Sequence, residues 1–200
     1  MRKLLIASTN RGKVKEVRAL LKDFPFQIIG LDKYPHLKNI KEDGDTFREN
    51  ALKKARVSAE ETKCLTLADD SGLVVDYLDG RPGIYSSRFA GKNATDCDNN
   101  EKLLNELSGV KKELRTARFR CFMALIDPEN DVREVVEGSC EGIILNEPRG
   151  DNGFGYDPLF YLPQYEKTMA QLPAEEKNKI SHRAEALNKI KKIIRERYKE

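Results

Sequence analysis

The chain has no tryptophan, only two histidines and only four cysteines among its 200 residues. The cysteines are widely and irregularly spaced, with no CxxC pair and no cluster with histidine: Cys64, Cys97, Cys121 and Cys140. Protein zinc sites need closely spaced Cys and His ligands, so a zinc site is not expected. Free thiols in a reducing compartment are the simplest interpretation.

Long hydrophobic runs are also absent. No apolar stretch approaches the roughly 20 residues that cross a bilayer, so we expect no membrane partner. The N-terminus has two basic residues before an apolar stretch, but that stretch is shorter than the roughly 7–15 apolar residues of a signal peptide. We therefore expect a first strand there and a cytoplasmic protein.

The net charge of +3 is mild, because 36 Lys and Arg residues are interspersed with 33 Asp and Glu residues. Such a balance gives no case for a nucleic-acid partner. No serine–histidine pair, reactive cysteine or GxSxG motif indicates a covalent nucleophile. The length fits one large domain or two small lobes.

The most informative stretch is Leu65 to Asp76, in which two apolar runs flank Asp69, Asp70, Ser71 and Gly72. The pattern predicts a buried strand that stops at the two acids, a turn at Gly72 and a second strand. Carboxylates at the end of a buried strand could hold a hard cation such as Mg²⁺ or orient a water. The alternative is an ordinary tight turn.

A polar loop joins the first predicted strand, Lys3 to Ala7, to a helix in which Val14, Val17, Leu20 and Leu21 share one face. Unpaired N–H groups at a helix start favour a phosphate, and Lys13 adds a full positive charge. The alternative is a plain capped helix, and the Walker spacing is absent. The loop comprises Ser8, Thr9, Asn10, Arg11, Gly12 and Lys13.

A capping box at Thr46 and Glu49 predicts a helix to about Glu61, packed closely through Ala51, Ala55 and Ala59. Glu42, just before it, is a metal ligand or a solvated loop acid. Further on, we expect a helix over 98–107, an antiparallel hairpin with strands over 117–126 and 131–145, and a last helix to about residue 198.

The segment 148–160 holds several glycines around Phe154, Gly155, Tyr156 and Asp157. An exposed aromatic ring between glycines is a platform for a nucleobase, and the alternative is a ring turned back into the core. Near the C-terminus, Ser181 caps the last helix and places His182 and Arg183 in its first turn. Cations are disfavoured there by the helix dipole, which suggests an anionic or carbonyl-bearing partner.

Taken together, these motifs resemble those of the inosine triphosphate pyrophosphatase family, also called dITP/XTP or non-standard purine NTP pyrophosphatases. They follow the family's order over nearly the whole chain, with Ser8 replacing the threonine of several relatives as a small departure. The motifs are Ser8-Thr9-Asn10-x-x-Lys13, Thr46-Phe47-x-Glu49-Asn50-Ala51, Ala68-Asp69-Asp70-Ser71-Gly72-Leu73, Pro82-Gly83-Ile84-Tyr85-Ser86-Ser87-Arg88, Gly153-Phe154-Gly155-Tyr156-Asp157-Pro158 and Ser181-His182-Arg183.

The resemblance implies an α/β fold with a long mixed twisted sheet flanked by helices, in one domain over residues 1–200 with two lobes and a central active-site cleft. It implies a homodimer that hydrolyses ITP, dITP and XTP to the monophosphate and pyrophosphate. It also implies Mg²⁺ as the cofactor and removal of deaminated purines from the nucleotide pool as the purpose.

The resemblance also implies roles for single residues. Asp70 is the catalytic acid and, with Glu42, a metal ligand, while Asp69 supports the site. The residues implied to bind substrate are Ser8, Thr9, Asn10, Arg11, Gly12 and Lys13 for the triphosphate, Ser71, and Phe154, Gly155, Tyr156, Asp157, Lys177, His182 and Arg183 for the base and sugar. Two rival functions are a pyrophosphatase for modified pyrimidines or methylated nucleotides, and a non-enzymatic nucleotide sensor or RNA-binding module.

Overall fold

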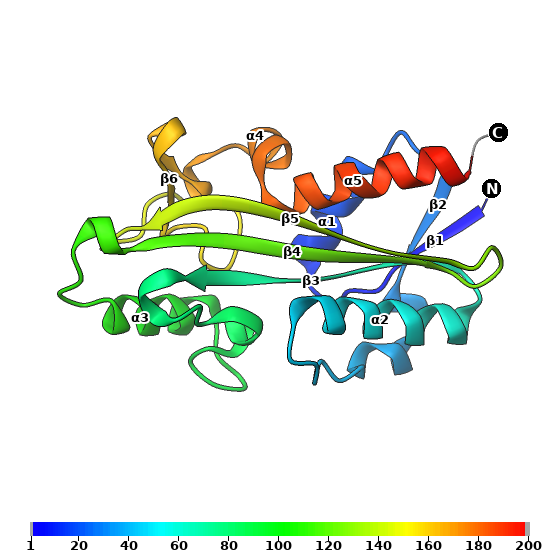
Figure 1. Ribbon diagram of the computed structural model, residues 1–200, viewed down its shortest axis with the longest axis horizontal. Coiled ribbons are helices and arrows are strands. Elements are labelled where there is room, and N and C mark those ends of the chain that lie inside the picture. Colours follow the sequence, from blue (N-terminus) through cyan, green and yellow to red (C-terminus); the bar gives the residue numbers. More distant parts are fainter. Residues whose placement is uncertain (1, 199–200) are drawn as a thin grey trace. The chain divides into compact units, whose positions relative to one another are not determined.

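The computed structural model describes residues 2–198, in which seven strands form one mixed sheet of order β2-β1-β3-β4-β5-β6-β7 (Figure 1). Strand β1 pairs in parallel with β2 and β3, whereas β6 pairs antiparallel with β5 and β7. The predicted mixed sheet flanked by helices is confirmed. The strands are β1 (Arg2–Ile6), β2 (Phe26–Gly30), β3 (Leu65–Val75), β4 (Thr116–Asp127), β5 (Val132–Ile144), β6 (Phe160–Leu162) and β7 (Lys167–Thr168).

The α-helices are α1 (Arg11–Leu20), α2 (Phe47–Thr62), α3 (Asp96–Glu106), α4 (Ala174–Ile180) and α5 (His182–Arg197). Of these, α1, α2, α3 and α5 lie close to their expected places. Helix α3 begins two residues earlier than expected, because Thr95 and Asp98 form a reciprocal capping box. Over the described part of the chain, no helix is both long and apolar enough to span a bilayer.

Two compact units divide the chain. The first unit contains the residues up to Asp70, then Cys121–Gly138, then the residues from Arg183 onward. The second unit contains Ser71–Arg120 and Ser139–His182.

The first unit has helices on both faces of its part of the sheet. Leu4 and Ile6 of β1 pack with residues of α1 and α5, whereas the alternate residues Leu5 and Ala7 pack with α2. This alternation follows from the two-residue period of a strand, which turns successive side chains to opposite faces. Figure 1 shows α1 and α5 on one side of these strands and α2 on the other.

The alanines of α2 explain its close approach to the sheet. Ala51, Ala55 and Ala59 recur four residues apart and are fully buried, as expected from the sequence. Thr46 accepts a hydrogen bond from the Glu49 backbone N–H at 3.1 Å, but the Glu49 carboxylate accepts from Asp45 rather than from Thr46. Only half of the predicted capping box therefore forms.

The predicted break within residues 65–76 is wrong. Strand β3 runs without interruption from Leu65 to Val75, through Asp69, Asp70 and Gly72. The apolar residues on both sides of the acids are buried, and neighbouring strands β1 and β4 hold the backbone extended. The turn propensity of Asp, Ser and Gly is overridden by this pairing.

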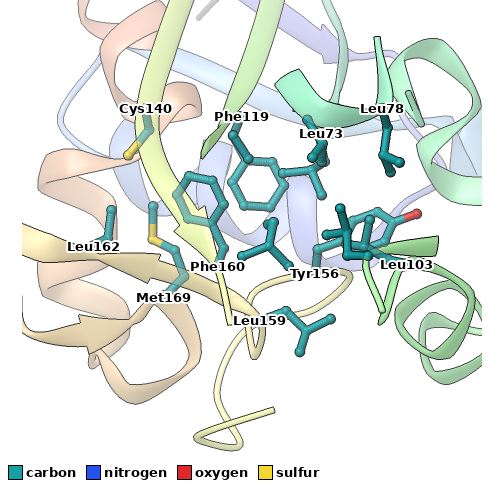
Figure 2. Packing of buried hydrophobic residues seen from close by; sticks show 14 of the residues in the cluster. Leu73, Leu78, Leu103, Phe119, Cys140, Tyr156, Leu159, Phe160, Leu162 and Met169 are labelled. Carbon is teal, nitrogen blue, oxygen red and sulfur yellow. The ribbon is translucent and has the colours of Figure 1, made fainter. Parts of the chain in front are cut away.

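The second unit has its own hydrophobic core (Figure 2). Leu73 and Leu103 contribute to it from β3 and α3, and Phe119 contributes from β4. The rings of Phe119 and Phe160 lie 4.5 Å apart between their centroids, so Phe160 is a core residue, as expected. This core supports the glycine-rich loop that precedes β6, because Tyr156 and Leu159 of that loop are buried in it.

Candidate functional site

The two central acids point to opposite faces of β3, because they are adjacent in a continuous strand. Asp69 lies on the face that carries α1 and α5, and Asp70 lies on the face that carries α2. Both carboxylates are buried, at 4% and 5% exposure. Asp69 and Asp70 are thus neighbours in the sequence, but their carboxylates lie in different environments on opposite faces of the sheet.

Asp69 is surrounded by cations. Its Oδ2 atom lies 3.0 Å from the Lys13 ammonium and 3.4 Å from the Arg183 guanidinium. Arg183 in turn lies 2.6 Å from Glu16. Burial alone would raise the pKa of Asp69, but Lys13, Arg183 and Lys54 outweigh it and hold that pKa well below its usual value. Asp69 is therefore ionised and fixed.

Asp70 has the opposite balance. Burial raises its pKa, the nearby Glu42 carboxylate raises it further, and Lys54, Lys13 and Asn50 compensate only in part. Lys54 lies 2.8 Å from Glu42 and is itself buried, and the surrounding carboxylates raise its pKa despite that burial. Neighbouring carboxylates with divergent pKa values are typical of sites that divide acid–base and electrostatic roles.

Glu42 and Asp70 also suit a hard cation. Both offer oxygen ligands, and the Lys54 ammonium, which lies 2.8 Å from Glu42, also acts electrostatically on Asp70. No group of three or more Asp, Glu, His or Cys side chains within residues 2–198 is arranged to hold a metal by itself. Mg²⁺ is usually held by one or two carboxylates together with substrate phosphates and water, so this donor set fits it.

The polar loop before α1 is organised as a helix start. Asn10 is the N-cap, and its side chain accepts a hydrogen bond from the Lys13 backbone N–H at 3.1 Å. Ser8 accepts one from the Asn10 N–H at 3.3 Å. Thr9 and Arg11 are exposed, and Gly12 is partly exposed. The loop thus presents the positive end of α1 beside the Lys13 ammonium, which suits a phosphate.

In the second unit, the structure brings together three of the expected residues. The Asp157 carboxylate accepts from the Phe154 N–H at 2.9 Å and lies 2.5 Å from the Lys177 ammonium of α4. That ammonium stands over the Phe154 ring, 4.7 Å from its centroid. Phe154 is partly exposed rather than buried in the core. A half-exposed ring with a cation on one face suits stacking of a planar base.

The remaining expected residues are placed as follows. His182 is buried and stacks on Phe119, with the ring centroids 4.8 Å apart and the planes at 16°. Arg183, which follows it in α5, is turned to Asp69 and Glu16. Ser71 follows Asp70 in β3 and is partly exposed. Tyr156 is buried and donates a hydrogen bond to the Ser86 carbonyl at 2.8 Å.

Sequence reasoning missed Glu16, Asn50 and Lys54 as neighbours of the two acids. A signal for the last two was present. Asn50 and Lys54 lie four residues apart in α2, next to Ala51 and Ala55, so a polar pair borders the most closely packed face of a buried helix. Glu16 gave no such signal, because a glutamate in a charged helix is ordinarily solvated.

The chain matches the family model described as the Ham1 family over residues 4–193. It is 52% identical over 196 residues to the dITP/XTP pyrophosphatase of Desulforamulus reducens, covering 98% of this chain and 97% of that protein. It is 51% identical over 191 residues to the dITP/XTP pyrophosphatase of Geobacter sulfurreducens, covering 96% of each.

A solved structure of a HAM1 protein from Coxiella burnetii superposes with a TM-score of 0.89 at 44% identity, covering 98% of this chain and 100% of the other. These similarities extend over almost the full length of the chain and include all of the segments described above. The chain belongs to the Ham1 family.

Proposed function

We propose that this protein hydrolyses non-standard purine nucleoside triphosphates, ITP, dITP and XTP, to the nucleoside monophosphate and pyrophosphate. The relatives that carry the name dITP/XTP pyrophosphatase support this proposal. The observation on which it rests most is the environment of Asp70, a buried carboxylate with a raised pKa beside Lys54 and Glu42. Removing deaminated purines from the nucleotide pool is the proposed purpose.

The proposed reaction is attack of water on the α-phosphorus. A bond forms between the water oxygen and phosphorus, the bond from phosphorus to the bridging oxygen breaks, and pyrophosphate leaves. Asp70 accepts the proton that the water loses, as a buried carboxylate beside Glu42 and Lys54. Lys13 and the start of α1 hold the triphosphate.

Mg²⁺ is the proposed cofactor, held by Glu42 and Asp70. When bound, it would supply positive charge that neutralises the phosphates and the two carboxylates. Asp69 has a different role in this proposal. Its ion pairs keep Lys13, proposed to bind the phosphates, and Arg183, proposed to recognise the base, in fixed positions, so neither cation needs to rearrange when the substrate binds.

Base recognition is assigned to Phe154, Asp157, Lys177, His182 and Arg183. Phe154 stacks on the base, and donors among the cationic side chains bond the 6-oxo group of hypoxanthine or xanthine. Adenine has an amino group at that position, so the donors would be left without acceptors, which disfavours binding strongly. Ser71 is proposed to contact the substrate as well.

The test is release of pyrophosphate and monophosphate from ITP, XTP, GTP and ATP, with Mg²⁺ and with a chelator. We expect ITP and XTP to turn over far faster than GTP and ATP, with pyrophosphate as the product and no turnover in the chelator. Equal turnover of all four would remove the base-recognition roles. Retention on RNA without turnover of any triphosphate would support a binding module instead.

We also propose that the protein is a homodimer in the cytoplasm, as the resemblance to the family implies. Light scattering on the purified protein measures the oligomeric state directly. A mass of one chain at micromolar concentration would contradict the dimer.

A further inference from the structure

Helix α3 holds the glycine-rich loop through one residue of that loop, Gly155. The Asp96 carboxylate accepts a hydrogen bond from the Gly155 N–H at 2.7 Å, and the Asn100 side-chain amide donates one to the Gly155 carbonyl at 2.9 Å. Asp96 and Asn100 are four residues apart and so lie on the same side of α3. Both backbone polar groups of Gly155 are therefore bound by one helix.

Gly155 directly follows Phe154, so the bonds to Gly155 restrict the chain next to that ring. Gly153 and Gly155 both adopt positive φ angles, +80° and +62°, which are accessible to glycine at little cost. On the other side of Phe154, the Asp157 carboxylate bonds its N–H. Side chains thus bind both peptide groups that flank the ring, and the Asp157 N–H adds a backbone bond to the Phe154 carbonyl at 3.3 Å.

Helix α3 is well anchored for this purpose. Asn99 accepts from the Ala90 N–H at 2.8 Å, and Lys102 donates to the Phe89 carbonyl at 2.7 Å. Leu103 packs into the core of the second unit. The helix start is capped by Thr95 and Asp98, which hydrogen-bond each other. The bonds to Gly155 are made by other side chains than the helix cap, so they can be removed while the capping bonds are kept.

We propose that Asp96 and Asn100 are positioning residues that set the affinity for the base by fixing Gly155, and with it the ring of Phe154. The inference rests on the proposed function, in which Phe154 stacks on the purine. A ring that is already fixed binds without the entropy loss of ordering a glycine loop. Loss of the bonds should therefore raise KM and leave kcat almost unchanged.

The kinetic test compares four variants with ITP as substrate. Asp96→Ala and Asn100→Ala should each raise KM by about tenfold, the change expected from losing one strong hydrogen bond. Asp96→Asn keeps an acceptor oxygen and should restore most of the affinity. Asp98→Ala is the matched control, because it removes the helix cap without touching Gly155, and should lower stability while leaving KM unchanged.

A double-mutant cycle assigns the effect to Phe154. In a Phe154→Ala background, Asp96→Ala should cause little further rise in KM, because the ring that it positions is gone. An equal rise in both backgrounds would overturn the proposal, and so would an unchanged KM in the two single alanine variants.

Hydrogen exchange keeps the proposal testable if the enzyme does not act on ITP. Amides of residues 153–157 should exchange faster in Asp96→Ala and Asn100→Ala than in the wild type and in Asp98→Ala. Faster exchange in a protein without ITP turnover would support the positioning of the loop while the proposed function fails. Unchanged exchange would overturn the positioning, whatever the activity.

Discussion

The surroundings of the Asp70 carboxyl group oppose its ionised form. Burial raises its pKa and Glu42 adds a like charge, while Lys54 offsets these effects only in part. A carboxyl group with a raised pKa stabilises the fold at low pH, and that contribution is lost as the pH rises through the folded-state pKa. At neutral pH the ionised carboxylate therefore lowers the stability of the protein.

Asp70→Asn should separate function from stability. Turnover should fall by about 10²–10⁴-fold, the usual contribution of a general base. The free energy of unfolding at pH 7 should be unchanged or higher, because a neutral amide has no buried charge. The measurements are kcat for ITP and urea unfolding at pH 7.

Asp79→Asn provides the matched control for this substitution. It makes the same chemical change at an exposed position with a φ of +52°, which asparagine also tolerates. Both turnover and stability should remain at the wild-type level there. Wild-type turnover in Asp70→Asn would rule out Asp70 as the catalytic residue.

At the scale of elements, helix α2 both packs against the sheet and supplies side chains near Asp70. Its alanines allow close contact with the sheet, and Asn50 and Lys54 extend from the same helix toward Asp70. The distance between the helix and the sheet therefore sets the position of the Lys54 ammonium. A larger residue between α2 and the sheet should therefore lower both the free energy of unfolding and the catalytic rate.

Ala55→Leu tests this connection. Ala55 is fully buried, so the added methyl groups should lower the free energy of unfolding by about 1–3 kcal/mol and should also reduce kcat. Arg56→Leu, on the exposed side of α2, is the control and should change stability by no more than about 0.5 kcal/mol. A destabilised Ala55→Leu protein with full activity would contradict the link to Lys54.

At the scale of the whole molecule, Asp69 connects segments that are far apart in the sequence. Lys13 comes from α1, Asp69 from β3 and Arg183 from α5, and Glu16 adds a second acid to Arg183. The depressed pKa of Asp69 means that the folded protein favours its ionised form. The ionised Asp69 therefore stabilises the fold. This stabilisation is complete above the unfolded-state pKa and is lost as the pH falls through the folded-state pKa.

Asp69→Asn should therefore be destabilised in a pH-dependent way. At pH 7 the free energy of unfolding should be lower than that of the wild type by about 3–5 kcal/mol, because Lys13 and Arg183 lose a buried partner. Below about pH 4, near the unfolded-state pKa of aspartate, the difference from wild type should shrink. Urea unfolding at pH 7, 5, 4 and 3 measures this, and a difference that stays constant down to pH 3 would contradict it.

Much of the local structure follows from local sequence. The strand that becomes β1, the helix with its alanine face and the hairpin of β4 and β5 were predictable, because side-chain periodicity reports directly which face is buried. The sequence also indicated the loop before α1 and offered Phe154 as a candidate platform, and the structure shows this ring partly exposed. The order of the sequence motifs along the chain indicated its family, and the match to the Ham1 family model confirms it.

The tertiary structure alone decided the arrangement of the acids. Local sequence favoured a turn after Asp69 and Asp70, whereas pairing with neighbouring strands keeps β3 extended and sends the two carboxylates to opposite faces. Their divergent pKa values then depend on cations from α1, α2 and α5. The family resemblance implied different roles for the two aspartates, but burial and charge distances exist only in the folded chain, so no local pattern could have predicted their opposite pKa shifts.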